Sequence, residues 1–179
     1  MQLTRGTVDS DALPRSTRRI GPISVIPMSP AIGAEVRGVD ISRELDQDTV
    51  IAIKQAWHEH LVLLFRGQTL TPEQQIFFSS YFGLPQSPNR TSFTPMTEKY
   101  PEIVEVQNVD MDKERIDRSL SNAEAFWHTD MSYKEIPPAA SALYSREIPP
   151  SGGNTCVCNM YMAYDDLPAD LLKQIQGRK

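Results

Sequence analysis

The pattern of apolar and polar residues predicts three short strands within the first 65 residues of the chain. Residues 23–27 and 34–37 alternate from one residue to the next, which is the spacing of a strand that buries one face. Gly33 and Gly38 bracket the second segment and indicate turns. Residues 61–65 are apolar throughout, so we expect a strand that is buried on both faces.

A helical repeat of apolar residues lies between the second and third of these strands. Asp46 or Asp48 can cap its start, because an aspartate oxygen accepts hydrogen bonds from the first backbone N–H groups of a helix. We expect this helix to run to about His60. Its apolar face consists of Val50, Ile53, Trp57 and Leu61.

A second helix has a stronger start signal. Thr71 is a capping residue, Pro72 suits the first helical position, and Gln74 can close a capping box with Thr71. We expect the helix to end near Phe82, with Gly83 in the left-handed conformation as its terminator.

The second half of the chain shows little helical periodicity. Prolines make up 14 of the 179 residues, a larger share than the usual roughly 5%. Because proline interrupts helices and strands, we expect short elements. Gly152 and Gly153 indicate a tight turn, and a last helix opens at residues 166–168 and closes at Gly177. Together with the early helices this predicts an α+β fold whose β core closes on itself. We expect strands over 103–109, 140–145 and 155–159, and loops over 84–101 and 110–124, the last of these mobile.

Composition and charge narrow the classes of function. A content of 40% apolar and 23% charged residues fits a globular protein, and 179 residues suffice for one domain with a core. The net charge is −5 without a basic block, so nothing favours nucleic-acid binding. No stretch approaches the roughly 18 apolar residues of a membrane span, so no membrane partner is expected.

The cysteines and the N-terminal segment indicate a compartment. Cys156 and Cys158 are too close in sequence for a good disulfide, so we expect buried structural thiols in a reducing compartment, the cytoplasm. Residues 1–20 carry four arginines among polar residues and no apolar signal core, which predicts a flexible tail.

A histidine and an aspartate two residues apart are the strongest candidates for chemistry. His128 and Asp130 lie where we expect a strand, and side chains two positions apart on a strand point to the same side. An imidazole nitrogen and a carboxylate oxygen suit Fe(II), whereas thiolates favour zinc. Taken alone, the pair also fits a histidine that is simply hydrogen-bonded to an aspartate. No histidine follows His128 in the chain.

The other residues of chemical interest favour structural roles. His58 and His60 diverge on a helix, so we expect a solvated helix end rather than a metal site. On a strand, Thr155 and the two cysteines face opposite ways, so they cannot line one site together. Trp57 and Trp127 are expected in the core.

Several short motifs occur in a characteristic order. They are residues 33–40, 64–68 with 70–75, Phe82-Gly83, Trp127-His128-Thr129-Asp130, and Pro137-Pro138 through Gly152-Gly153-Asn154-Thr155. In this order and spacing the chain, from about Ile23 to its end, resembles the taurine dioxygenase-type (TauD/TfdA) family of Fe(II)- and α-ketoglutarate-dependent dioxygenases.

The resemblance implies a fold, a cofactor and a role for three residues. The fold is a double-stranded β-helix (jelly-roll) core with flanking helices. His128 and Asp130 match the first two iron ligands, and Thr155 matches the threonine that hydrogen-bonds the distal carboxylate of α-ketoglutarate. The implied reaction hydroxylates a small organic substrate with O2 and releases succinate and CO2.

The family's distal histidine and its arginine near the C-terminus have no counterpart here. We therefore expect residues 21–179 to be the N-terminal portion of one dioxygenase domain, incomplete at its C-terminus. Arg66 and Arg146 remain as cations, but the sequence places neither at the site.

The chain also departs from the family pattern at the substrate side. The taurine enzyme has a histidine shortly after its Phe-Gly pair, whereas residues 84–88 contain none, and Glu124 replaces an asparagine upstream of the metal pair. Taurine is therefore disfavoured, and another small acid or organic substrate is expected.

A second hypothesis belongs to a different class of function. With two of three ligands, the chain would be a catalytically incompetent fragment, at most a weak metal-binding or interaction module. Exposed strand edges would then favour a homo-oligomer.

Overall fold

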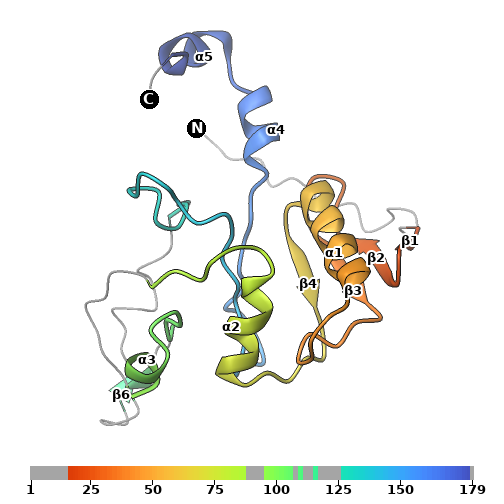
Figure 1. Cartoon of the computed structure of the whole chain (residues 1–179). Coiled ribbons are helices and arrows are strands. Elements are labelled where there is room, and N and C mark those ends of the chain that lie inside the picture. Colours follow the sequence, from red (N-terminus) through yellow and green to blue (C-terminus); the bar gives the residue numbers. More distant parts are fainter. Residues whose placement is uncertain (1–15, 88–94, 107–108, 111–114, 117–125, 178–179) are drawn as a thin grey trace. The chain divides into compact units, whose positions relative to one another are not determined.

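The computed structural model describes residues 16–87, 95–106, 109–110, 115–116 and 126–177 (Figure 1). The chain divides into two compact units. We call Met1–Asp40, Leu45–Gln68 and Pro149–Lys179 the sheet unit, and Ile41–Glu44 with Thr69–Ile148 the α2 unit. The elements are β1 Arg18–Ile20, β2 Ile23–Pro27, β3 Ala34–Arg37, α1 Gln47–His60, β4 Leu63–Phe65, α2 Pro72–Ser80, α3 Pro95–Lys99, β5 Val109–Asp110, β6 Arg115–Ile116, α4 Met160–Asp165 and α5 Ala169–Ile175.

The sheet unit contains a four-stranded sheet in the order β1-β2-β3-β4. The first three strands are antiparallel neighbours, and β4 pairs with β3 in parallel. Helix α1 lies against this sheet (Figure 1). The predicted strands over 23–27 and 34–37 are confirmed. The buried core consists of alternate strand residues and one face of α1: Ile20, Ile23, Val25, Ala34, Val36, Ala52, Ile53 and Ala56.

Asp46, rather than Asp48, caps the start of helix α1. The Asp46 Oδ1 atom accepts a hydrogen bond from the Thr49 backbone N–H at 2.8 Å, and Oδ2 accepts one from the Thr49 hydroxyl at 2.9 Å. These bonds, the backbone one first, hold the pKa of the Asp46 carboxyl below its usual value. The helix ends at His60, as predicted.

The strand predicted over 61–65 is shorter and less buried than expected. Leu61 closes α1 with a φ of 65°, so the strand begins only at Leu63. All three of its residues are half-buried. These residues are not fully buried because β4 is an edge strand, with a neighbouring strand on one side only.

Helix α2 begins with the predicted capping box. The Thr71 hydroxyl accepts from the Gln74 backbone N–H at 3.3 Å, and the Gln74 side chain accepts from the Thr71 backbone N–H at 2.7 Å. The helix ends at Ser80, two residues before the predicted end. Gly83 has a positive φ of 155°, a value that favours glycine, and it lies three residues beyond the end of the helix.

Several strands predicted in the second half do not form. Residues 103–106, 140–145 and 155–159 carry no strand. A strand requires backbone hydrogen bonds to a neighbouring strand, and within the described parts of the chain these segments are in neither sheet. The rest of the predicted strand at 107–109 is outside the described residues except for Val109, which starts β5.

The predicted loops contain short elements. Helix α3 lies within the loop predicted over 84–101. In the loop predicted over 110–124, β5 and β6 form a small antiparallel pair, and the remaining residues of that loop lie outside the described parts. The predicted last helix is confirmed as α5, and α4 before it was not predicted.

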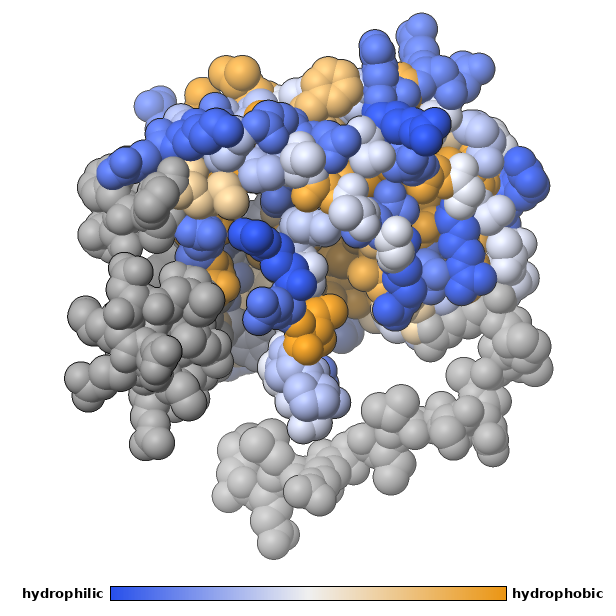
Figure 2. All heavy atoms as spheres, turned by 90° about the horizontal axis from the view of Figure 1, so that it is seen from below, coloured by the Kyte–Doolittle hydropathy of each residue, from blue (hydrophilic) through white to orange (hydrophobic). Residues whose placement is uncertain are grey.

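Large apolar side chains are exposed in both units, and Figure 2 shows apolar patches among polar residues on one face. Trp127 is 73% exposed, so its predicted place in the core was wrong. Cys156 and Cys158 are free and exposed rather than buried, because the strand expected to carry them is absent. Among the described residues, no helix has both the length and the apolarity that a membrane span requires.

Candidate metal site

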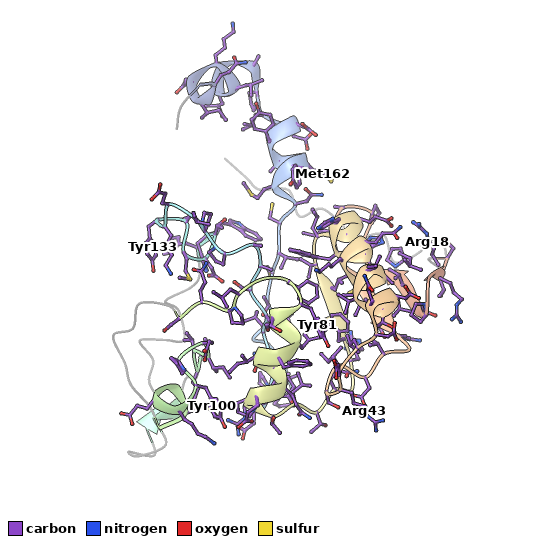
Figure 3. All side chains as sticks on the ribbon, in the orientation of Figure 1. Arg18, Arg43, Tyr81, Tyr100, Tyr133 and Met162 are labelled. Atoms are coloured by element: carbon purple, nitrogen blue, oxygen red, sulfur yellow. The ribbon has the colours of Figure 1, made fainter. Side chains whose placement is uncertain are left out.

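His128 and Asp130 meet, although the strand predicted for them does not form. Residues 127–129 have no regular structure, and a turn begins at Asp130. Met131 has a φ of 51°, and the Lys134 backbone N–H closes the turn on the Met131 carbonyl at 3.0 Å. Figure 3 labels Tyr133 on this turn. The His128 Nε2 atom lies 3.5 Å from Asp130 Oδ1.

A backbone carbonyl orients the imidazole of His128. Nδ1 lies 2.9 Å from the Phe126 carbonyl oxygen. A carbonyl oxygen can only accept, so Nδ1 is the protonated nitrogen that donates. In the neutral ring the lone pair is then on Nε2, the nitrogen that faces Asp130, and a metal ligand requires that lone pair.

The two oxygens of Asp130 have different partners. Oδ2 accepts a hydrogen bond from the Ser141 hydroxyl at 2.5 Å, while Oδ1 faces His128. The carboxylate is thus held on one side and presents one oxygen toward the imidazole. Ser141 was missed in the sequence, where the only signal was one hydroxyl within an otherwise apolar run over 139–143.

The segment that carries Ser141 is attached to the start of α2. The Leu70 backbone N–H donates to the Tyr144 hydroxyl at 3.1 Å, and Gln75 Nε2 donates to the Ala142 carbonyl at 3.3 Å. These bonds hold residues 142–144 without a strand pairing.

The pair fits one divalent ion. Ligands about 2.1 Å from a first-row metal are about 3 Å apart when they subtend a right angle, so a gap of 3.5 Å can close on a shared ion. One imidazole and one carboxylate are two of the three ligands in the two-histidine, one-carboxylate site that binds Fe(II). The side chains are 51% and 54% exposed, and the described residues contain no cluster of three or more His, Cys, Asp or Glu that could hold a metal.

Thr155 belongs to the sheet unit, whereas His128 and Asp130 belong to the α2 unit. It lies in an exposed segment between a bend at Ser151 and helix α4. Gly152 and Gly153 have φ values of 77° and 67°, which favour glycine. The turn predicted at this pair stays a prediction, since the bends lie just before it, at Pro150 and Ser151. The structure brings the histidine and the aspartate together, and the role of Thr155 stays a prediction.

Comparison with known proteins places the chain in a family. A family model described as "Taurine catabolism dioxygenase TauD, TfdA family" matches residues 24–179. The chain belongs to the TauD/TfdA family. Members of this family are α-ketoglutarate-dependent dioxygenases.

Individual TauD/TfdA relatives are longer than this chain. It is 34% identical over 157 residues to an alpha-ketoglutarate-dependent 2,4-dichlorophenoxyacetate dioxygenase of Cupriavidus pinatubonensis, covering 84% of this chain and 55% of that protein. It is 38% identical over 144 residues to an alkylsulfatase of Acinetobacter baylyi, covering 80% and 41%. The chain thus spans about half the length of the curated relatives it matches.

A solved structure shares the fold over most of the chain. The crystal structure of AAD-2 in complex with Mn(II) and N-oxalylglycine matches with a TM-score of 0.67 and 25% identity, covering 85% of this chain and 53% of that one. The described elements form a mixed α and β structure with a small sheet and helices.

The arginines considered as cosubstrate partners have carboxylate partners in the structure. Arg66 Nε lies 3.4 Å from Glu35 Oε2, and Arg146 lies 3.9 Å from Glu105 Oε1. Arg37 donates to Glu35 at 2.6 Å and is the main cause that lowers the pKa of Glu35, with Arg66 adding to it.

His58 and His60 lie in the last turn of α1, as predicted. His58 is exposed and His60 is half-buried. The Trp57 and His58 rings pack with centroids 5.3 Å apart. The described residues around them form no group of metal ligands.

Proposed function

We propose that this protein is an Fe(II)- and α-ketoglutarate-dependent dioxygenase that hydroxylates a small organic substrate and releases succinate and CO2. The observation that carries the proposal is the approach of His128 Nε2 to Asp130 Oδ1 at 3.5 Å in a chain of the TauD/TfdA family. His128 and Asp130 would hold the iron. Thr155 would donate its hydroxyl to the distal carboxylate of α-ketoglutarate.

The bound iron would supply O2 activation coupled to oxidation of the cosubstrate. The residues of this chain would hold the two metal ligands in place. Phe126 fixes the imidazole through Nδ1, and the turn closed at Lys134 holds Asp130 beside it. Substrate and O2 are the partners that this proposal requires.

We further propose a small organic acid as the substrate. The relatives include dioxygenases named for 2,4-dichlorophenoxyacetate, for a sulfate ester and for (S)-phenoxypropionate, all of which are anionic compounds. Residues 84–88 contain no histidine, which disfavours taurine.

The proposal includes the fold and the setting of the site. A jelly-roll core would span residues 21–179 as the N-terminal portion of one dioxygenase domain. The tail predicted over residues 1–20 is shorter than expected at its end, because Arg18–Ile20 form strand β1. The match to AAD-2 supports this fold.

Two free thiols fit a reducing compartment, so we propose the cytoplasm.

Anaerobic titration tests the function. Fe(II) added to the protein with α-ketoglutarate should produce a metal-to-ligand charge-transfer band in visible light, and His128→Ala should remove it. Admission of O2 with an organic acid such as phenoxyacetate should then produce succinate. The absence of the band in the wild-type chain would overturn the proposal.

A second candidate function has one observation in its favour. The described residues contain no cluster of three His, Cys, Asp or Glu residues. This favours a weak metal-binding or interaction module, for which a homo-oligomer is the proposed assembly. Metal binding without succinate formation in the titration would support this candidate instead.

A further inference from the structure

Ser141 controls one oxygen of the candidate iron ligand. Its hydroxyl donates to Asp130 Oδ2 at 2.5 Å across 11 residues of sequence. The other oxygen, Oδ1, is the one that lies 3.5 Å from His128 Nε2. We propose that Ser141 is a positioning residue that makes Asp130 a one-oxygen ligand for a divalent metal, an inference that rests on the proposed function.

The physical reason is the freedom of a carboxylate. Rotation about the Cβ–Cγ bond of aspartate is broad, because the terminal torsion has no sharp staggered wells. Without a partner, the two oxygens of Asp130 would exchange places or turn together toward a metal. A hydroxyl on Oδ2 stops this rotation and assigns Oδ1 to the metal, because a hydrogen bond to a charged acceptor is among the stronger ones.

Ser141 can do this only if its own backbone is fixed. The next residue, Ala142, accepts from Gln75 Nε2 at 3.3 Å, and Tyr144 accepts from the Leu70 backbone N–H at 3.1 Å. Gln75 lies in α2, whose capping box fixes the start of the helix. Helix α2 and the residue before its cap therefore hold the segment 141–144 in place, and this segment in turn positions the Asp130 carboxylate.

His128 is held in a matching way. The Phe126 carbonyl accepts from Nδ1 at 2.9 Å and sets the plane of the ring. Each ligand then has one atom bound to a protein group and the other turned toward its neighbour. Such hydrogen-bonded partners typically change metal affinity by roughly 10- to 100-fold when they are removed.

Mn(II) binding to the full 179-residue chain tests the inference, with electron paramagnetic resonance reporting the unbound metal. Ser141→Ala should weaken Mn(II) binding by about tenfold or more. Ser141→Thr keeps the hydroxyl and should bind within about twofold of the wild type. Ser145→Ala removes an exposed serine of the same segment and should bind like the wild type.

The outcomes separate this inference from the proposed function. If the wild type binds Mn(II) and Ser141→Ala binds equally well, the positioning role is wrong and the proposed function stands. If the wild type does not bind Mn(II), both are overturned. A loss in Ser141→Thr or Ser145→Ala equal to that in Ser141→Ala would show a general disturbance of the segment and would also overturn the role.

Discussion

Single side chains account for the best-defined local features of both units. Asp46 satisfies the first N–H groups of α1 through Thr49. Glu73 near the start of α2 accepts a hydrogen bond from the Tyr100 hydroxyl and lies 3.8 Å from Lys99. These contacts favour the ionised form of each carboxylate. Each carboxylate also lies at a helix N-terminus, where negative charge is stabilised.

The cap of α1 makes stability depend on pH. The pKa of Asp46 is below the ordinary aspartate value of 3.8 in the folded chain, so the unfolded chain takes up the proton first as the pH falls. The contribution of Asp46 is complete above about pH 4 and is lost as the pH falls through the lower folded pKa. Asp46→Ala should lower the Tm more at pH 7 than at pH 2.5, as measured by circular dichroism. Equal losses at both pH values would contradict this assignment.

The bond between Tyr100 and Glu73 predicts a measurable titration. The Tyr100 hydroxyl is the main cause that lowers the pKa of Glu73 to about 2. Tyr100→Phe should therefore raise the pKa of Glu73 toward the ordinary glutamate value of 4.5. Carbon-13 NMR of the Glu73 side-chain carboxyl measures this directly, and an unchanged pKa in the variant would show that another group holds the charge.

At the scale of elements, α1 and the sheet hold most of the buried apolar side chains among the described residues. Ile53 on α1 is 1% exposed and lies in the same core as Ile23 and Val25 of β2. Ile51 is on the same helix but is 55% exposed. The helix therefore offers two isoleucines with opposite surroundings.

Truncation of these two isoleucines compares the stability contribution of a buried side chain with that of an exposed one on the same helix. Ile53→Ala should destabilise the chain by about 2–5 kcal/mol, because it removes buried methyl groups and leaves a cavity. Ile51→Ala should change stability by less than about 0.5 kcal/mol. Urea unfolding followed by Trp fluorescence checks both, and similar losses in the two variants would mean that α1 does not pack as described.

At the scale of the whole molecule, metal binding at the candidate site should increase the stability of the folded chain. A ligand that binds only the folded state stabilises it by about 2.7 kcal/mol at 100 times its Kd. Mn(II) at that excess should raise the Tm of the wild type, and Asp130→Ala should abolish the rise. An equal rise in Asp130→Ala would place the metal elsewhere in the chain.

Much of the local structure was predictable from the sequence. The strands at 23–27 and 34–37, the helix ending at His60 and the capping box of Thr71 all follow from short-range patterns. These signals act over a few residues, because capping and side-chain periodicity involve neighbours along the chain. The choice of His128 and Asp130 as a pair was also within reach of the sequence.

What the sequence by itself determined is therefore where α1, α2 and α5 begin and which two residues to propose as metal ligands. Tertiary structure alone decided that His128 and Asp130 meet through a turn rather than a strand, and that Ser141 binds the aspartate. It also left 140–145 and 155–159 outside both sheets. The physical reason is that strand pairing and side-chain contacts join residues far apart in sequence, such as Leu70 and Tyr144 across 74 positions, and no local pattern encodes such partners.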